Sequence, residues 1–183
     1  MQALIFKFAD VILHRDELVK LNVEYITWVT SGVDKALGVS MVDLVGKSIV
    51  VYVDSTIDKV CSDKPPHGVF YLVEVHGEIA GMVGLRKLTA DVAEIKRLYV
   101  RPEFRGRHLG GCFIQKILQD AKQFGYQSVY LDTAPFMFSA QRLYKSFGFK
   151  LRASYAGTEI PIELHAAWVF MECDLSKVDL ETL

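Results

Sequence analysis

The sequence has few cysteines, and none of them stands in a metal-binding or disulfide pattern. Of 183 residues only three are cysteine, Cys61, Cys112 and Cys173, and no C-x-x-C pair occurs. An odd number of widely spaced cysteines argues against a zinc site and against a disulfide framework. We therefore expect no metal ion and a reducing environment.

Long apolar runs and an excess of charge are also missing. No stretch of 18 uninterrupted apolar residues occurs, which excludes a membrane-spanning helix. Residues Met1 to Lys7 lack the basic region and apolar core of a signal peptide, which favours a cytoplasmic location. The chain has 21 basic and 22 acidic side chains, so neither nucleic acid nor an anionic membrane is expected as a partner.

Apolar periodicity and turn residues predict a mixed α/β protein. The segments with strand character are 4–8, 69–75, 78–88, 92–100, 128–133, 149–154 and 167–174. Helical spacing runs from about Asp10 to Gly32, from Met41 to Cys61, from Leu109 to Phe124 and from Met137 to Phe147. Within the second helix, Ser48 to Val53 is β-branched enough for a strand to be the alternative. Antiparallel strands followed by strands interleaved with helices predict one mixed sheet with helices packed on it.

A loop from Asp63 to Gly68 separates a mainly helical part, residues 1–66, from a sheet-containing part, residues 67–183. A chain of this length can bury a large core as a single domain. We therefore expect one domain with two parts.

A basic turn with glycines lies between a predicted strand and a predicted helix. The run Arg105-Gly106-Arg107-His108-Leu109-Gly110-Gly111 follows the strand 92–100 and opens the helix at Leu109. Unpaired N–H groups and the dipole at a helix start favour phosphate, and glycine lets a ligand approach the backbone. The alternative is that Arg105 and Arg107 are solvated loop residues.

The segment from Ala93 to Gly110 resembles the acetyl-coenzyme A signature of the GNAT acyltransferases, whose loop reads Arg/Gln-x-x-Gly-x-Gly/Ala. Arg105 fills the first position and Gly110 the last, while His108 stands where the middle glycine is expected. A second segment, Ala140 to Phe149, resembles the family's Ala-x-x-Leu-Tyr-x-x-x-Gly-Phe. The two motifs stand in the family's order, with a predicted strand between them.

This resemblance implies the acyl-coenzyme A N-acyltransferase fold, a mainly antiparallel mixed sheet flanked by helices, with acetyl-coenzyme A as the co-substrate. The acetyl group would pass directly to an amine of a small molecule or a peptide, without a metal. Residues 1–66 would form the acceptor side and residues 67–183 the cofactor-binding core. The alternative is a regulatory module that binds an acyl-coenzyme A without turnover. The apolar segment Ala167 to Cys173 could support a homodimer.

The resemblance also implies the cofactor-binding residues. The pyrophosphate would bind the loop, at Arg105, Gly106, Arg107, His108, Leu109, Gly110 and Gly111. The pantetheine arm would pair with the strand edge at Leu98, Tyr99 and Val100. A bulge near Arg97 would explain the imperfect apolar alternation of this strand and would splay it to admit the arm. Ser139 would add one further contact.

Tyr144 matches the family's tyrosine that protonates the departing thiolate and also lies against the cofactor. A phenol with an ordinary pKa of about 10 still holds its proton at neutral pH, as an acid must. The alternative is a core aromatic, because Ala140, Leu143 and Phe147 share its helical face.

Glu94 could act through water as the general base for the amine. Alternatively, it binds the substrate or pairs with Lys96 or Arg97. Three residues at strand ends would face the acceptor and are the candidate substrate-binding residues: Arg97, Asp132 and Thr133.

Overall fold

The fold is built on one seven-stranded sheet, seen in a computed structural model that describes residues 4–40, 42–43 and 46–179. In spatial order the strands are β1 (Leu4–Phe8), β2 (Val69–Val75), β3 (Glu78–Lys87), β4 (Val92–Val100), β5 (Ser128–Thr133), β7 (Val169–Asp174) and β6 (Lys150–Arg152). Neighbouring strands are antiparallel, except that β4 and β5 are parallel. This sheet confirms the predicted fold class.

The last two strands are shorter than predicted. A 3₁₀ turn over Ile162–Leu164 precedes β7, and the N–H groups of Ala167 and Trp168 both donate to the Leu164 carbonyl. These two residues therefore belong to the turn, and the strand begins at Val169.

The helix α1 (Arg15–Leu37) begins and ends later than the sequence predicts. Its start is delayed because the Asp10 carboxylate accepts the N–H groups of Ile12 and Leu13, each at 2.9 Å, and forms a turn there. Gly32 does not end the helix. It lies against the Phe136 ring, in a position where a Cβ would be 2.1 Å from that ring, so it is a packing glycine. The helix ends at Gly38, which has a φ of 66°.

The segment Ser48 to Val53 begins a helix, so the strand alternative is wrong. Helix α3 (Ile49–Cys61) starts after Ser48, whose Oγ accepts the Val51 N–H. It buries Val53, Ile57 and Cys61, which are spaced four residues apart on one face. This burial on the sheet outweighs the β-branched composition of its first turn. Met41, the predicted start, lies outside the described residues.

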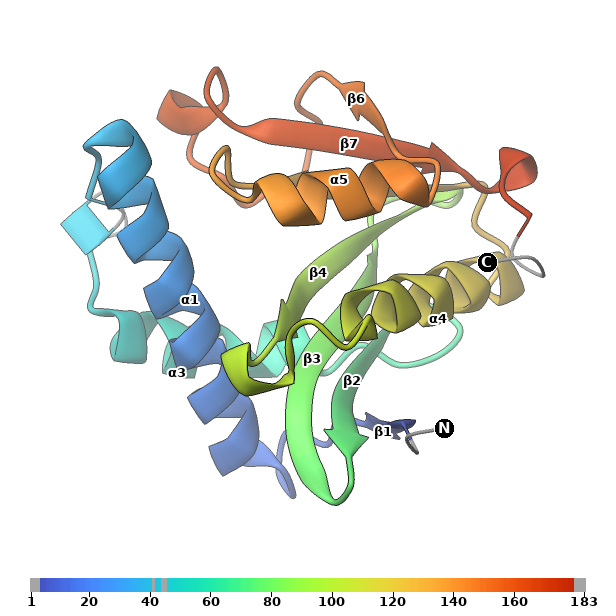
Figure 1. Cartoon of the computed structure of the whole chain (residues 1–183), viewed down its shortest axis with the longest axis horizontal. Coiled ribbons are helices and arrows are strands. Elements are labelled where there is room, and N and C mark those ends of the chain that lie inside the picture. Colours follow the sequence, from blue (N-terminus) through green and yellow to red (C-terminus); the bar gives the residue numbers. More distant parts are fainter. Residues whose placement is uncertain (1–3, 41, 44–45, 180–183) are drawn as a thin grey trace.

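Two helix layers cover the two faces of the sheet (Figure 1). On β2, Phe70 and Leu72 pack in a cluster with α1 and α3. The alternate residues Tyr71 and Val73 pack in the opposite cluster, with α4 (Leu109–Gln123) and α5 (Phe138–Ser146). The period of two along β2 thus separates an α1–α3 side from an α4–α5 side.

Strands β4 and β5 pair only over their first residues. The paired positions are Val92 with Ser128, Ala93 with Val129 and Glu94 with Tyr130, and no pairing follows Glu94. Just beyond this point the register between β4 and β3 slips, and Arg97 has a φ of 55°. The predicted bulge near Arg97 is therefore confirmed. Figure 1 shows β4 running away from the part of the sheet that carries β7 and α5.

Strands β3 and β4 approach closely at Gly81. A Cβ at this position would lie 2.1 Å from the Tyr99 carbonyl oxygen and 3.0 Å from the Phe113 ring. We expect Gly81→Ala to lower the free energy of unfolding by about 2–3 kcal/mol, because the strand backbones must move apart. Urea unfolding measures the change.

Gly111→Ala is the matched control. Its Cβ would lie 3.6 Å from the Phe147 ring, an ordinary contact, on a helix that alanine favours. The control should be neutral or up to about 1 kcal/mol more stable than the wild type. Wild-type stability in Gly81→Ala would show that β3 and β4 are not held at this spacing.

Candidate active site

The loop between β4 and α4 has two residues in the left-handed conformation. Gly106 has a φ of 77° and His108 a φ of 60°. This conformation costs a residue with a side chain roughly 1–2 kcal/mol, whereas glycine adopts it freely. The backbone at position 108 therefore explains why the GNAT pattern has a glycine there.

Five consecutive backbone N–H groups in this loop have no acceptor among the described residues: Gly106, Arg107, His108, Leu109 and Gly110. The run ends at Gly111, whose N–H donates to the His108 carbonyl at 3.1 Å. At Gly110 a Cβ would lie 3.0 Å from Leu143 Cδ2, so a glycine lets α4 approach α5 there. The unpaired donors lie at the positive end of the helix dipole of α4, which is the arrangement of an anion site.

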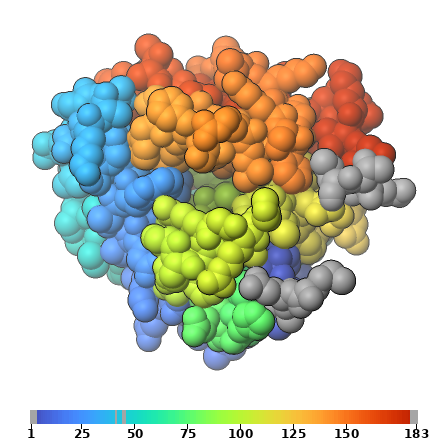
Figure 2. Space-filling model, in the orientation of Figure 1, coloured from blue at the N-terminus to red at the C-terminus, as the bar shows by residue number. Residues whose placement is uncertain are grey.

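The two loop arginines are exposed and form no ion pair with any residue that the structure describes. Arg105 Nε donates to the Val100 carbonyl at 3.0 Å, and its guanidinium lies 5.1 Å from the Trp28 ring centroid. Arg107 Nη2 donates to the Glu103 carbonyl at 3.4 Å. Figure 2 shows the yellow-green surface of this loop directly below the orange surface of α5. Two cations without a partner carboxylate thus border the unpaired N–H groups.

The end of β4 presents main-chain groups to the gap beside β5. The Arg101 N–H donates to the Ala80 carbonyl on β3, so its neighbour Val100 faces the other way, toward the gap. The Val100 carbonyl is held by Arg105. Tyr99 is buried, with its ring 5.7 Å from Tyr25 on the α1 side, and Leu98 is half-buried in the cluster on the α4 side.

Tyr144 on α5 is buried, and its ring lies 5.8 Å from Phe149. Its hydroxyl forms no hydrogen bond with any described residue. Burial raises the pKa of Tyr144, and the nearby Tyr25 and Asp132 raise it further. The phenol therefore keeps its proton at neutral pH and well above it. Ser139, one turn earlier on α5, is exposed and accepts a hydrogen bond from Arg142 at 3.2 Å.

A cavity of about 150 Å³, called here the helix-side cavity, lies on the α1–α3 side of β4. Its walls come from α1, α3, the bulged part of β4, the end of β5 and the loop before β7. The lining residues are Tyr25, Ile26, Val29, Thr30, Val42, Lys47, Ile49, Tyr52, Ile95, Lys96, Arg97, Asp132, Glu159, Ile160, Pro161 and Trp168.

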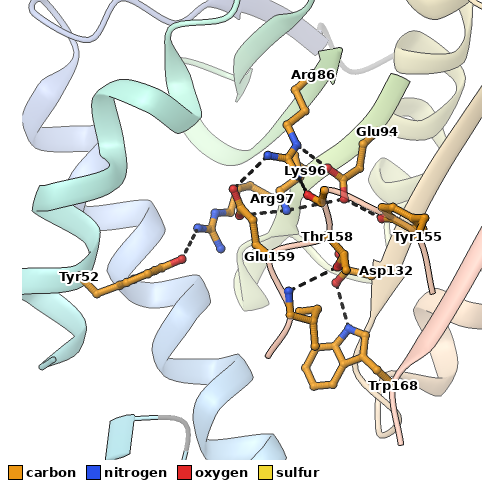
Figure 3. A network of polar contacts seen from close by, with 12 residues as sticks. Tyr52, Arg86, Glu94, Lys96, Arg97, Asp132, Tyr155, Thr158, Glu159 and Trp168 are labelled. Carbon is orange, nitrogen blue, oxygen red and sulfur yellow. Dashed lines mark hydrogen bonds and ion pairs between the residues drawn. The ribbon is translucent and has the colours of Figure 1, made fainter. Parts of the chain in front are cut away.

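Glu94 is fully buried and lies outside the lining of the helix-side cavity. Arg86 Nε donates to its Oε2, the Tyr155 hydroxyl donates to its Oε1 at 2.6 Å, and Lys96 Nζ is 3.9 Å from Oε1 (Figure 3). Burial raises the pKa of Glu94, although Lys96 and Arg86 oppose this shift. The predicted pairing with Lys96 is present, and a role as general base stays a prediction.

Glu159 is a charged cavity residue that the sequence did not single out. It comes from the loop between β6 and β7 and binds Arg86 Nη1 and Lys96 Nζ, each at 3.1 Å. Burial opposes its ionisation, but Lys96 and Arg86 together lower the pKa of Glu159. No local pattern marks Glu159. Arg86 could have been found, because it stands opposite Glu94 in the β3–β4 register.

The structure brings two of the three candidate substrate-binding residues together. Arg97 and Asp132 both line the helix-side cavity, and Asp132 Oδ1 accepts a hydrogen bond from Trp168 Nε1 at 2.9 Å. Thr133 is buried with its hydroxyl 3.4 Å from Met137 Sδ, outside the cavity lining. Their roles in binding an acceptor stay predictions.

Within the described ranges, no three His, Cys, Asp or Glu side chains are grouped as a metal site would require. None of the helices there is long and apolar enough to span a bilayer.

Comparison with known proteins gives consistent results. Residues 46–149 match the Acetyltransferase (GNAT) family. An N-acetyltransferase of Schizosaccharomyces pombe is 40% identical over 115 residues, which are 62% of this chain and 68% of that protein. The N-acetyltransferase YjgM of Escherichia coli is 31% identical over 88 residues, 46% of this chain and 53% of that protein.

Solved structures share the fold. The PaiA N-acetyltransferase of Thermoplasma acidophilum, in complex with coenzyme A, superposes with a TM-score of 0.67 at 16% identity over 94% of this chain and 99% of that one. The family match covers more than half of the 183 residues and includes both motifs. The chain belongs to the Acetyltransferase (GNAT) family of N-acetyltransferases.

Proposed function

We propose that the protein transfers an acetyl group from acetyl-coenzyme A directly to an amine of a small molecule or a peptide. The observation that carries this proposal is the run of five unpaired N–H groups from Gly106 to Gly110 at the start of α4. The run lies beside a strand that has separated from its parallel neighbour. The unpaired N–H groups suit a pyrophosphate, and the free strand edge suits an extended amide chain.

The chain offers matching partners for coenzyme A. Gly106 to Gly110 would hold the pyrophosphate through N–H groups, with Arg105 and Arg107 adding positive charge. Leu109 and Gly111 would set the start of α4, and Ser139 would contact the cofactor from α5. The pantetheine amides would run along the end of β4 at Leu98, Tyr99 and Val100 and would pair with the main-chain groups that face the gap, such as those of Val100.

Bound acetyl-coenzyme A would supply a thioester carbonyl as the acyl donor. The Tyr144 hydroxyl, which holds its proton because of burial, would donate that proton to the leaving sulfur. A backbone N–H at the free edge of β4 would stabilise the oxyanion. Glu94 would accept the amine proton through water, and Arg97, Asp132 and Thr133 would bind the acceptor.

Calorimetry with coenzyme A tests the binding half of the proposal. We expect the wild type to bind it, and Arg105→Gln/Arg107→Gln to weaken binding by about tenfold or more, because charge-assisted contacts with phosphate are lost. Pantetheine, which has no pyrophosphate, should bind weakly and equally to both proteins.

Arg15→Gln is the matched control, because Arg15, the first residue of α1, pairs with Asp54 and Asp58 on α3 and lies outside the site. Its affinity for coenzyme A should equal that of the wild type. If millimolar coenzyme A gives no heat with the wild type, the proposed function is wrong.

Tyr144→Phe tests the acid. We expect kcat to fall by about 10²-fold or more, while the affinity for acetyl-coenzyme A stays the same, since only the proton donor is removed. Stability should hardly change, because the hydroxyl makes no hydrogen bond that would be lost. A raised pKa also means that the tyrosine stays protonated through the alkaline range, so it should not cause a fall in kcat up to a pH of about 9. A normal kcat in the variant would show that Tyr144 is not the acid and only packs in the core.

Glu94→Gln separates a general base from a structural anion. If Glu94 is the base, the rise of kcat/KM with pH disappears in the variant. If Glu94 mainly holds Arg86 and Tyr155, the pH profile keeps its shape. In either case the half-buried Arg86 loses one of its two carboxylate partners, and we expect the free energy of unfolding to drop by about 1–3 kcal/mol. A pH–rate profile distinguishes the two roles, and chemical denaturation of the same sample measures the loss of stability.

Steady binding of coenzyme A without thiol release, across a panel of amines, peptides and amino acids, would favour the regulatory module over the enzyme.

A further inference from the structure

We propose that the acceptor amine belongs to a molecule that also carries a carboxylate, and that Arg97 binds this carboxylate in the helix-side cavity. This acceptor class rests on the proposed acetyl transfer, whose substrate it specifies. Three features of the site support it: the direction of Arg97, its unpaired Nε and lack of an ion pair within the described residues, and an acidic residue, Asp132, in the same cavity lining.

The bulge in β4 directs Arg97 into the cavity. In a regular strand, Lys96 and Arg97 would point to opposite faces of the sheet. The register slip and the positive φ of Arg97 remove this alternation, and both side chains line the helix-side cavity. A left-handed conformation is strained for arginine, and such strain persists mainly at binding and catalytic sites.

Arg97 has unused donors inside the protein. Its Nε is buried and has no hydrogen-bond partner. Its Nη2 is 3.5 Å from the Tyr52 hydroxyl, and its guanidinium lies 5.7 Å from the centroid of the Tyr25 ring. It forms no ion pair within the described residues. A guanidinium is always charged, and buried donors are nearly always satisfied, so the site has room for an anion from outside.

The neighbouring cations are already paired. Arg86 binds Glu94 and Glu159, and Lys96 binds Glu159 at 3.1 Å. Figure 3 shows the Arg97 guanidinium directed toward Tyr52. Arg86 and Lys96 thus hold the carboxylates of Glu94 and Glu159. Arg97 interacts with Glu159 only over a longer distance and has no carboxylate within ion-pair distance among the described residues.

Asp132 in the same cavity suits the amine. Within the described residues only its Oδ1 accepts a hydrogen bond, from Trp168. Besides burial, the charge of Asp132 contributes to the raised pKa of Tyr144, the proposed acid. An acceptor with an ammonium group at Asp132 and a carboxylate at Arg97 and Tyr52 complements these residues. Arginine can bind a carboxylate through two parallel hydrogen bonds.

The size of the cavity favours a compact acceptor. Its volume of about 150 Å³ is small beside the roughly 300–1,000 Å³ of pockets for drug-sized ligands. A free amino acid or a similar short amino carboxylate fits this chemistry better than a long polyamine, whose charges are all positive.

Matched acceptors test the proposal on the wild-type protein. Thiol release is measured with saturating acetyl-coenzyme A and amino acids, the corresponding amino acid amides, and the corresponding amines without a carboxylate. We expect kcat/KM for the best amino acid to exceed that for its amide by about 100-fold or more, because a buried donor left unpaired rejects the analogue.

The proposal would be wrong if amides or plain amines were the better acceptors, or if no amino acid bound or reacted. Calorimetry with acetyl-coenzyme A on the same sample separates a failure of the proposed function from a failure of the carboxylate proposal. Loss of that binding would contradict the proposed function itself, whereas normal binding with a preference for uncharged amines would contradict only the carboxylate.

Variants then test whether Arg97 is the residue that binds the carboxylate of the acceptor. Arg97→Gln should raise the KM for the amino acid by about 100-fold and abolish the preference over the amide, with the KM for acetyl-coenzyme A unchanged. Arg97→Lys should restore part of the preference, and Arg15→Gln should behave as the wild type.

Equal losses with the amino acid and its amide would assign Arg97 a structural role instead. If Arg97→Gln does not fold, Tyr52→Phe tests the same preference for the amino acid over its amide, with a smaller expected effect. It should raise the KM for the amino acid by about tenfold and leave the KM for the amide unchanged, because one hydrogen bond to the carboxylate is lost. An unchanged ratio in Tyr52→Phe would contradict this geometry.

Discussion

The separation of β4 from β5 just after Glu94 is the constraint on which the site depends. While the strands are paired, their main-chain groups satisfy one another, and no ligand can enter between them. The bulge at Arg97 bends β4 away, which frees the edge near Val100. The same backbone change leads into the loop whose N–H groups are unpaired. One irregularity thus separates the strands just ahead of the loop that carries the unpaired N–H groups.

The bulge also divides the charges of the site. Upstream of it, Glu94 and Lys96 belong to a closed network with Arg86 and Glu159. At the bulge, Arg97 leaves this network and enters a cavity where its Nε has no partner. The network holds β3, β4 and the loop before β7 in fixed positions, because breaking any buried pair would leave a charge uncompensated. In the proposed function, Arg97 would bind the acceptor from this frame.

Local signals in the sequence predicted most of the sheet and the position of the loop between β4 and α4. The strands with turns at both ends, such as 92–100 and 128–133, were placed correctly, and imperfect alternation revealed the bulge at Arg97. Prediction failed where tertiary contacts decide. Gly32 reads as a helix end but packs on Phe136. Glu159 contributes to the cavity from a loop without a motif, so only the folded chain reveals its partners.

The central claim is that the unpaired N–H groups at the start of α4, next to the freed edge of β4, form the binding site for coenzyme A. Titration of ¹⁵N-labelled protein with coenzyme A, followed by amide NMR shifts, tests it most directly. The account predicts that the largest shifts occur at Gly106 to Gly110 and at Val100, and that the β2–β3 turn at His76 and Gly77 stays unchanged. Binding of coenzyme A that leaves the amides of Gly106 to Gly110 unmoved would contradict it.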